Sequence, residues 1–557
     1  MFLSYFKKEK KIMKSIKILC CLFLFTLSLI AQFNETIPTT HWIYHSIEKL
    51  QIGGYLRDLE QGCQPYTRMQ IARAIIQNEK SDIQNVRLKN DAKKNNLQQP
   101  SYDIKKTTSI ELNRIKKELK RELKYLHNEN DRNSFSYIKL GGTGSANFEQ
   151  SGETSNKSFI RIKSSLSLND NITIKYNDII DRGLIDDPLY IGDEWRGWAG
   201  YQEQVYIAYN TSFLELKYGR DYVKWGYGKR GRLLISDASR PFDMLSLKVR
   251  SNRLSFQTIM SQLNTVDSAQ RYLTAVRIEW NPFDNLYLGV AQAGLYGDED
   301  QSLDFTLSNP FSISYFAQHN DPKHLNAMIY LDAAYYWKNR YKFYGELLID
   351  DFQVDEEIES DLEPNELGFI LGIEGIDLWE DINGWCEFTQ VRNRTYNTQI
   401  DYEKFLHRNQ PIGHWLGTDF QRFQFQLDRW MNPKVRLECG YDLIRKGEGT
   451  IRGEFTTPWM DEDVTMETGY IEKIPYGIVE TTNRIYSTLH YKYNSHIHSN
   501  LQLGYKNINN LDHVSGKKSS NFYFNLSLWV DVDRYFKTEK GERRMENGGR
   551  KNGIDRH

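Results

Sequence analysis

The sequence lacks the features that would build a helical membrane protein or a disulfide-stapled one. Its 557 residues include only 5 cysteines and 13 prolines. After the first thirty residues, no apolar run approaches the about 18 residues that a transmembrane helix needs, so helical spans are excluded from the rest of the chain. Lys and Arg (72) balance Asp and Glu (73) at a formal net charge of -1, so bulk charge gives no reason to expect a nucleic-acid partner.

The cysteines do not form a recognisable framework. Cys20 and Cys21 lie inside the first apolar run, and Cys63, Cys386 and Cys439 are widely spaced. An odd number at such spacing predicts neither a disulfide scaffold nor a set of metal ligands. We therefore expect no cofactor and no structural metal. The acidic loop 350–363 is rich enough in oxygen ligands that calcium binding there is kept as an alternative.

The N-terminus is typical of an exported protein. The basic stretch KKEKKIMKSIK precedes the apolar run from Ile18 to Ile30, and Ala31 follows it before a polar region. A basic region, a short apolar region and a small residue are the parts of a secretory signal peptide. We predict that residues 1–31 are this signal peptide.

Residues 38–80 predict a helical hairpin. An apolar-aromatic helix containing Trp42 and Ile47 is stopped by Gly53, and a loop with Pro65 leads to a second helix. This order weakly resembles a surface-layer-homology unit, which would imply contact with peptidoglycan. A plain helical hairpin is the alternative.

A charged helical linker is expected over residues 81–132. Apolar side chains recur along one face of its helix, at Ile115, Leu119, Leu123 and Leu126. This face fits either a short periplasmic coiled coil or a helix packed on a neighbour, and its length is too small for a long stalk.

From residue 133 to residue 536 the helical period gives way to two-residue alternation. In the stretch IYLDAAYYW, one face carries Ile329, Leu331, Ala333, Tyr335 and Trp337, and the other carries Tyr330, Asp332, Ala334 and Tyr336. Successive side chains of a strand point to opposite faces, so this strand has an apolar face and a polar face. The same pattern recurs in three further stretches, each with aromatic residues beside a short turn: Trp280, Trp430, Tyr491 and Tyr493.

A soluble β-sandwich would also alternate. The length of about 400 residues, and the regular exchange of short turns with long loops, favour a membrane barrel instead, since only a closed barrel pairs every strand in lipid. We predict an all-β, antiparallel outer-membrane barrel of about 16–18 strands over residues 133–536, in contact with outer-membrane lipid. The helical N-terminal part would be periplasmic, the tail 537–557 disordered and the protein a monomer.

Barrel topology then predicts which connections reach the cell exterior. Turns on the periplasmic side of such barrels are short, and the opposite loops are long. The long segments expected outside are 180–200, 295–325, 351–366, 392–416 and 443–482. The aromatic residues beside short turns would form a girdle at the periplasmic rim.

One segment concentrates basic, aromatic and glycine residues. It reads GRDYVKWGYGKRGRLLISDASRPF, from Gly219 to Phe242, and its glycines allow it to fold inward or to form a tightly packed loop. Guanidinium groups suit carboxylates and phosphates, and aromatic faces suit sugar rings or cations. The candidate ligand-binding residues are Trp225, Tyr227, Lys229, Arg230, Arg232 and Arg240. The alternative is that these cations pair with carboxylates in the lumen and hold the barrel wall together.

Three stretches in this order resemble the Wzi capsule-assembly family. They are the segment just quoted, LSNPFSISYFAQHND from Leu307 to Asp321, and YGELLIDDFQVDE from Tyr344 to Glu356. The resemblance implies an outer-membrane barrel with a helical N-terminal portion, acting as a surface lectin that anchors capsular or other exported polysaccharide. It implies no catalysis.

Two other functions remain as alternatives. A peptidoglycan-tethered porin would also combine a surface-layer-like unit, a helix and a barrel. An outer-membrane enzyme is less well supported, because carboxylate pairs such as Asp350 and Asp351 lie in an acidic loop and no GxSxG motif is present. We therefore expect a binding protein and not an enzyme.

Overall fold

The computed structural model describes residues 34–80, 106–127 and 135–539, apart from positions 152, 157, 169–170, 313, 315–324, 354–357, 359–361, 380, 462 and 495. The predicted signal peptide, residues 81–105 of the predicted linker and most of the predicted tail lie outside the described residues. No described helix is both long and apolar enough to cross a membrane.

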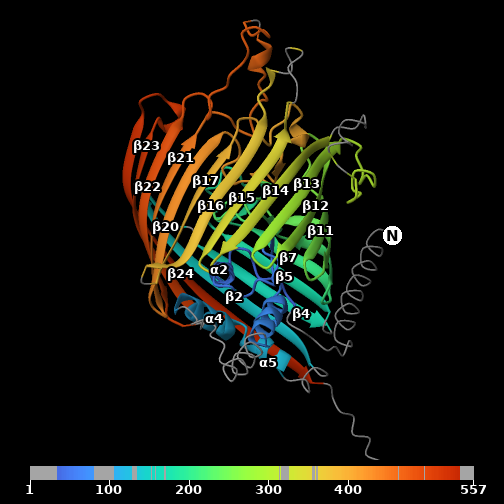
Figure 1. The fold of residues 1–557 in the computed structure, drawn as a ribbon, viewed down its shortest axis with the longest axis vertical. Coiled ribbons are helices and arrows are strands. Elements are labelled where there is room, and N and C mark those ends of the chain that lie inside the picture. Colours follow the sequence, from blue (N-terminus) through green and yellow to red (C-terminus); the bar gives the residue numbers. More distant parts are fainter. Residues whose placement is uncertain are drawn as a thin grey trace, which may run out of the picture.

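The described strands include 18 that close into one antiparallel barrel, in agreement with the predicted class and the predicted range of 16–18 (Figure 1). The first half of the wall is formed by β2 (Phe135–Ser151), β4 (Phe159–Leu168), β5 (Ile172–Asp181), β7 (Trp198–Asn210), β8 (Leu214–Asp221), β10 (Phe242–Arg250), β11 (Leu254–Gln262), β12 (Gln270–Phe283) and β13 (Leu286–Asp298). The second half is formed by β14 (Leu325–Trp337), β15 (Tyr341–Asp351), β16 (Glu366–Trp379), β17 (Ile382–Val391), β20 (Phe420–Asn432), β21 (Val435–Lys446), β22 (Glu480–Lys492), β23 (Ile497–Asn509) and β24 (Lys518–Glu539). Strand β24 pairs with β2, and this pairing closes the wall.

Short elements occupy the connections and the lumen. They are β1 (Cys63–Gln64), β3 (Glu153–Asn156), β6 (Glu194–Trp195), β9 (Lys224–Trp225), β18 (Leu406–His407) and β19 (Gln410–Pro411), with the 3-10 helices η3 (Asp401–Glu403), η4 (Pro458–Met460) and η5 (Leu511–His513). Strand β24 runs three residues past the predicted barrel end at residue 536.

The predicted alternation matches the two faces of the wall. On β14, Leu331, Tyr335 and Trp337 are exposed on the outer face, whereas Tyr330 and Asp332 are buried on the inner face. A lipid-facing apolar band and a polar interior are what an outer-membrane barrel requires. The two-residue period therefore assigned the faces of this strand correctly.

The aromatic girdle is only partly as predicted. Trp280, Tyr491 and Tyr493 are exposed beside short turns, but Trp430 is 5% exposed and faces the lumen. Its indole Nε1 donates a hydrogen bond of 2.9 Å to Glu111, and the guanidinium of Arg114 lies 4.4 Å from its ring centroid. Placing Trp430 in the girdle was wrong, because it shares the inward parity of the even-numbered residues of β20.

The long connections gather at one end of the barrel. The described parts of residues 182–197, 299–324, 352–365, 392–419 and 447–479 lie at the end drawn uppermost in Figure 1, close to the predicted segments. The opposite end carries short turns such as residues 338–340 and 433–434. We call these the outer end and the short-turn end.

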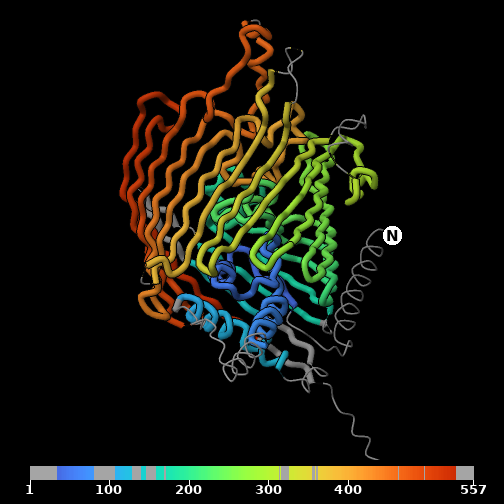
Figure 2. The backbone as a smooth tube through the Cα atoms, in the orientation of Figure 1, coloured from blue at the N-terminus to red at the C-terminus, as the bar shows by residue number. Residues whose placement is uncertain are grey.

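The N-terminal helices fill the lumen. Helix α2 (Ile43–Ile52) and the helical residues 68–80 lie inside the barrel, while α4 (Lys106–Glu118) and α5 (Lys120–His127) lie at the short-turn end (Figures 1 and 2). We call residues 34–80 the plug. The predicted apolar face of the linker, including Ile115 and Leu119, packs against the core of the plug. This is the helix packed on a neighbour, not the coiled coil.

Polar groups of the wall hold the plug in place. The Lys49 ammonium lies 2.6 Å from Asp428, and the Lys175 ammonium donates a 2.6 Å hydrogen bond to the Thr36 carbonyl oxygen. The Glu279 carboxylate accepts hydrogen bonds of 3.0 and 2.8 Å from the backbone amides of residues 61 and 62. The plug is thus part of the barrel interior, and the surface-layer-homology interpretation is not confirmed.

Candidate functional site

The basic-aromatic segment, residues 222–241, folds into the lumen between β8 and β10. Its strand β9 pairs with β1 of the plug, with Trp225 opposite Cys63. The Gly226 amide donates a 2.9 Å hydrogen bond to the Gly62 carbonyl, at a φ of +109°. A Cβ on Gly226 would lie 2.2 Å from the Tyr330 hydroxyl, so only glycine fits here. Of the two arrangements that the sequence allowed for this segment, the structure shows the inward fold.

The connection of residues 392–419 covers this segment on its outer side. The Ser236 amide donates a 2.9 Å hydrogen bond to the Ile412 carbonyl, and the Tyr396 hydroxyl donates to the Leu233 carbonyl. Arg394 in turn lies 2.7 Å from Glu472 in the connection of residues 447–479. The plug, the inward segment and the folded outer loops therefore follow one another along the lumen.

Two of the candidate residues pack inside this interior. Trp225 and Tyr227 are buried at 0% and 1% exposure, and the Trp225 indole donates a 3.1 Å hydrogen bond to Gln257. The Tyr227 backbone amide donates to Glu346 at 2.6 Å. Neither ring offers a free face to a ligand in this structure, so both contribute packing and not the predicted stacking.

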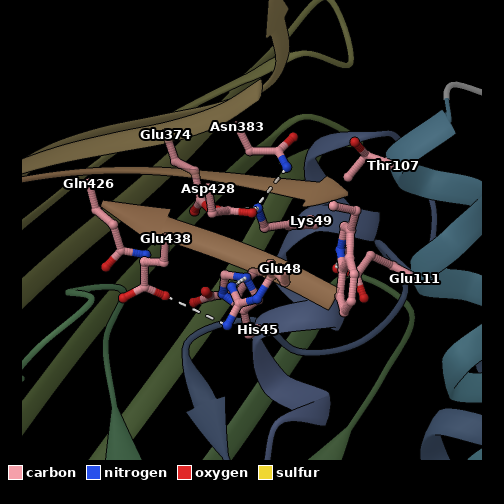
Figure 3. Close-up of polar contacts among 12 residues, drawn as sticks. His45, Glu48, Lys49, Thr107, Glu111, Glu374, Asn383, Gln426, Asp428 and Glu438 are labelled. Carbon is pink, nitrogen blue, oxygen red and sulfur yellow. Dashed lines mark hydrogen bonds and ion pairs between the residues drawn. The ribbon is translucent and has the colours of Figure 1, made fainter. Parts of the chain in front are cut away.

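Lys229 holds the plug to the wall. Its ammonium lies 2.7 Å from Glu48 on α2 and 2.8 Å from Glu374 on β16; Figure 3 shows these two carboxylates at the interface between plug and wall. Burial alone would raise the pKa of Glu48, but the charge of Lys229, aided by that of Lys342 and by the Lys229 hydrogen bond, lowers it to about 2. For Lys229 the geometry matches the alternative in which lumen cations pair with carboxylates.

Arg230 and Arg232 line an internal cavity of about 450 Å³ between the plug and the wall. The Arg230 side chain is 47% exposed and lies 3.7 Å from Glu438. Arg232 is buried, and its Nη1 donates a 3.1 Å hydrogen bond to the neighbouring Gly231 carbonyl. These two cations face the space between the plug and the wall and not the outer pocket.

Arg240 reaches the outer end. It lines a second cavity of about 490 Å³, which we call the outer pocket, together with Tyr190, Tyr201, Arg220 and Arg408. The Arg240 guanidinium lies 4.5 Å from the ring centroid of Tyr201 and 5.8 Å from that of Tyr190. The structure thus brings one predicted cation together with two tyrosines and two arginines from separate connections and strand ends.

Positive charge is concentrated in the outer pocket. Arg220 donates to Asp243, with Nε at 2.7 Å from the carboxylate, whereas Arg240 approaches Asp187 only to 3.8 Å. Burial lowers the pKa of Arg408, and the nearby charges of Arg220 and Arg240 lower it further. Three guanidinium groups held this close favour an anionic ligand.

Sequence reasoning missed most of the outer pocket. Tyr190 lies in the connection between β5 and β7, Tyr201 lies on β7, and Arg408 lies in the connection between β17 and β20. More than two hundred residues separate them, and no local pattern links them. Within the part of the chain that the structure describes, no group of His, Cys, Asp and Glu is arranged to hold a metal ion.

Comparison with known proteins identifies the family. The sequence model of the family described as "Capsule assembly protein Wzi" matches residues 133–522. The chain belongs to this family. The match covers the barrel as far as the start of β24 and includes all three stretches whose resemblance the sequence showed. This Wzi-family barrel lies in the outer membrane.

One solved structure supports the fold of this Wzi-family protein, and a second, more distant one is reported with it. The structure of Wzi from Escherichia coli, described as an outer-membrane protein involved in group 1 capsule assembly and as a carbohydrate-binding β-barrel, is 17% identical, with a TM-score of 0.56 over 90% of this chain and 99% of that chain. The structure of OccD3 (OpdP) from Pseudomonas aeruginosa is 11% identical, with a TM-score of 0.40 over 71% and 91% of the two chains. No curated protein matches the sequence significantly.

Proposed function

We propose that this Wzi-family barrel binds an acidic polysaccharide in its outer pocket and thereby retains capsular or other exported polysaccharide at the cell surface. The observation that carries the proposal is the pocket itself, in which three arginines and two tyrosines converge at the outer end. The family membership, and the description of the Escherichia coli structure as a carbohydrate-binding barrel in capsule assembly, support the same class of ligand.

The chemistry of the outer pocket suits a carboxylated sugar. Arg220 is already paired with Asp243, so Arg240 and Arg408 carry the charge that a ligand would neutralise. Arg240 lies beyond ordinary hydrogen-bond distance from Asp187, so its donors remain available for a carboxylate, in the bidentate geometry that guanidinium favours. Tyr190 and Tyr201 supply hydroxyl groups and ring faces beside it.

Retention requires binding without turnover, so no catalytic step is assigned. The porin alternative is less well supported, because the plug, the inward segment and the outer loops lie in succession along the lumen, whereas diffusion porins keep a water-filled channel. A single chain supplies the plug, the wall and the outer pocket, which favours a monomer as the functional unit. Contact of the plug with peptidoglycan is not part of the proposal.

The experiment measures how polysaccharide divides between cells and medium. We would compare a deletion strain, a complemented strain and a strain that carries Arg240→Gln with Arg408→Gln. The double variant should release polysaccharide into the medium at unchanged total synthesis, as the deletion does.

A matched control separates the pocket from a general loss of charge. Arg253→Gln with Arg429→Gln removes two partly exposed arginines towards the short-turn end, paired with Asp284 and Asp381 respectively, and should leave retention intact. If the deletion itself leaves the distribution unchanged, the proposed function is wrong. If only the pocket variant behaves like wild type, the function stands and the outer pocket is not its site.

A further inference from the structure

The internal cavity has the size and walls of a ligand site. Its volume of about 450 Å³ falls within the range of roughly 300–1,000 Å³ typical of small-molecule pockets. Three parts of the chain form it: the plug around residues 39–48, the inward segment around residues 224–232, and the inner faces of β17 and β20–β24. It is separate from the outer pocket, with which it shares no lining residue.

Cations outnumber carboxylates on the cavity wall. The lining cations are Lys224, Lys229, Arg230, Arg232 and Arg436, and the lining carboxylates are Glu48 and Glu438. Lys224 pairs with Asp237 at 3.0 Å, and Lys229 pairs with Glu48 and Glu374. Glu438 is shared between Arg436, at 3.6 Å, and Arg230, at 3.7 Å.

Arg232 is the lining cation that forms no ion pair with a described carboxylate. It is 3% exposed, and the described residues place no carboxylate within 4.0 Å of its guanidinium. Its Nε is buried and has no hydrogen-bond acceptor among those same residues. The charges of Glu346 and Glu48 act on Arg232 from beyond 4.0 Å, so the guanidinium has no direct ion pair among the described residues. An anion in the adjoining cavity would supply one.

The rest of the wall fits a sugar better than a simple anion. The neutral polar lining consists of Thr39, Thr40, Gln64, Gln426, Thr488, Asn500, Gln502, Asn525 and Ser527. Amides and hydroxyls both donate and accept hydrogen bonds, as sugar hydroxyls require. Trp385 adds an aromatic ring, with Lys229 and Arg230 at 5.9 and 6.0 Å from its centroid.

From these observations we infer that the internal cavity binds one acidic sugar unit, with its carboxylate at Arg232 and Arg230 and its hydroxyls on the amide-rich wall. The cavity is a second site inside the lumen, distinct from the retention site at the outer end. The inference rests on the proposed function only for the class of ligand, an acidic saccharide.

The test is a calorimetric titration of the purified full chain in detergent with glucuronate, glucose and inorganic phosphate. Glucuronate should bind, and binding should persist in the Arg240→Gln, Arg408→Gln protein, in which the outer pocket has lost two of its arginines and the internal cavity is unaltered. Arg232→Gln should weaken glucuronate binding about tenfold or more. Arg230→Gln should do the same, and since its side chain is half exposed, it keeps the test valid if Arg232→Gln does not fold.

Each other outcome overturns the inference. Absence of glucuronate binding, or binding that depends on Arg240 and Arg408 but not on Arg230, would remove the internal site. Phosphate binding that depends on Arg230, without glucuronate binding, would show a simple anion site. The proposed function is tested by retention of polysaccharide on cells, with Arg240 and Arg408 replaced. The internal site is tested by titration, with Arg230 and Arg232 replaced, so the proposed function and the internal site can fail independently.

Discussion

Replacing Lys49 with methionine should loosen the plug from the wall of the barrel. The Lys49 ammonium lies 2.6 and 2.7 Å from the two carboxylate oxygens of Asp428, and both side chains are 1% exposed. The Asn383 amide donates a further 3.2 Å hydrogen bond to Asp428 (Figure 3). The variant keeps the apolar stem but leaves the carboxylate buried with its amide partner alone.

The expected size of the effect follows from that burial. Breaking a buried ion pair by removing one partner costs about 3–5 kcal/mol, because the remaining charge is uncompensated. At about 1.4 kcal/mol for each factor of ten, the equilibrium between the docked and the open plug should shift towards opening by a factor of about 10² to 4 × 10³. Exposed pairs give far smaller shifts, since water replaces the lost partner.

Cys63 provides the assay. It lies in the plug at 1% exposure, and burial raises the pKa of its thiol to about 12, so it should react with a thiol reagent only when the plug opens. In a protein whose other cysteines are serine, Lys49→Met should raise the labelling rate about a hundredfold or more. Lys49→Met combined with Asp428→Leu removes both charges and should recover most of the protection. A labelling rate within about threefold of wild type, or a double variant as reactive as the single one, would refute the reasoning.

Three further predictions follow from the same interior and from the outer pocket. Trp225→Ala should lower stability by about 3–5 kcal/mol, read as a lower urea midpoint in detergent, because it opens a cavity in the core; an unchanged midpoint would contradict the packing role. The Glu48 carboxylate, with its pKa lowered to about 2, should stabilise the protein above pH 4.5 and lose that contribution as the pH falls towards 2. The urea midpoint of Glu48→Gln, measured against pH, should lack this part of the wild-type profile. An identical profile would argue against the ion pair with Lys229. Salt should weaken polysaccharide binding to wild type more than to the Arg240→Gln, Arg408→Gln protein, measured as retention at increasing ionic strength, and equal sensitivity would contradict a charged pocket.

The barrel could be predicted because its physical cause acts on each strand separately. Lipid on one side and a polar lumen on the other impose a two-residue period that a short stretch already displays, as in Leu331 against Asp332. The lengths of the connections then distinguish the outer end from the short-turn end. Trp430 shows the limit of proximity reasoning: being near a turn suggested the girdle, whereas its parity with Asp428 places it inside.

The position of the N-terminal helices could not be predicted in the same way. Their apolar faces show that they pack on something, but not on what, because the partner of Lys49 lies 379 residues further along the chain. The sequence pattern of a polar strand face is the same whether water, a plug or an inward loop occupies the lumen. The surface-layer-like interpretation arose from this ambiguity.

The sequence predicted the kinds of residue in the candidate site better than it predicted where those residues lie. The basic-aromatic segment was found because its composition is unusual, yet only Arg240 emerges in the outer pocket, while Trp225 and Tyr227 are core residues. Composition does not reveal on which side of an inward loop a side chain ends. Arg408 was missed because its relation to Arg240 exists only after the barrel closes.

The lumenal plug also constrains the order of assembly. The plug is synthesised first, but the groups that hold it, from Lys175 to Asp428, are spread over most of the wall. Contacts of such large sequence separation form slowly, and until they form, wall carboxylates such as Asp428 lack the counter-charge that the plug supplies. The plug precedes β2 in the chain, and β2 closes the wall with β24. If β2 pairs with β24 only after the plug has entered the lumen, closure of the wall and docking of the plug are the same final step. A truncation that removes residues 34–80 should therefore impair assembly of the barrel and not merely open a pore.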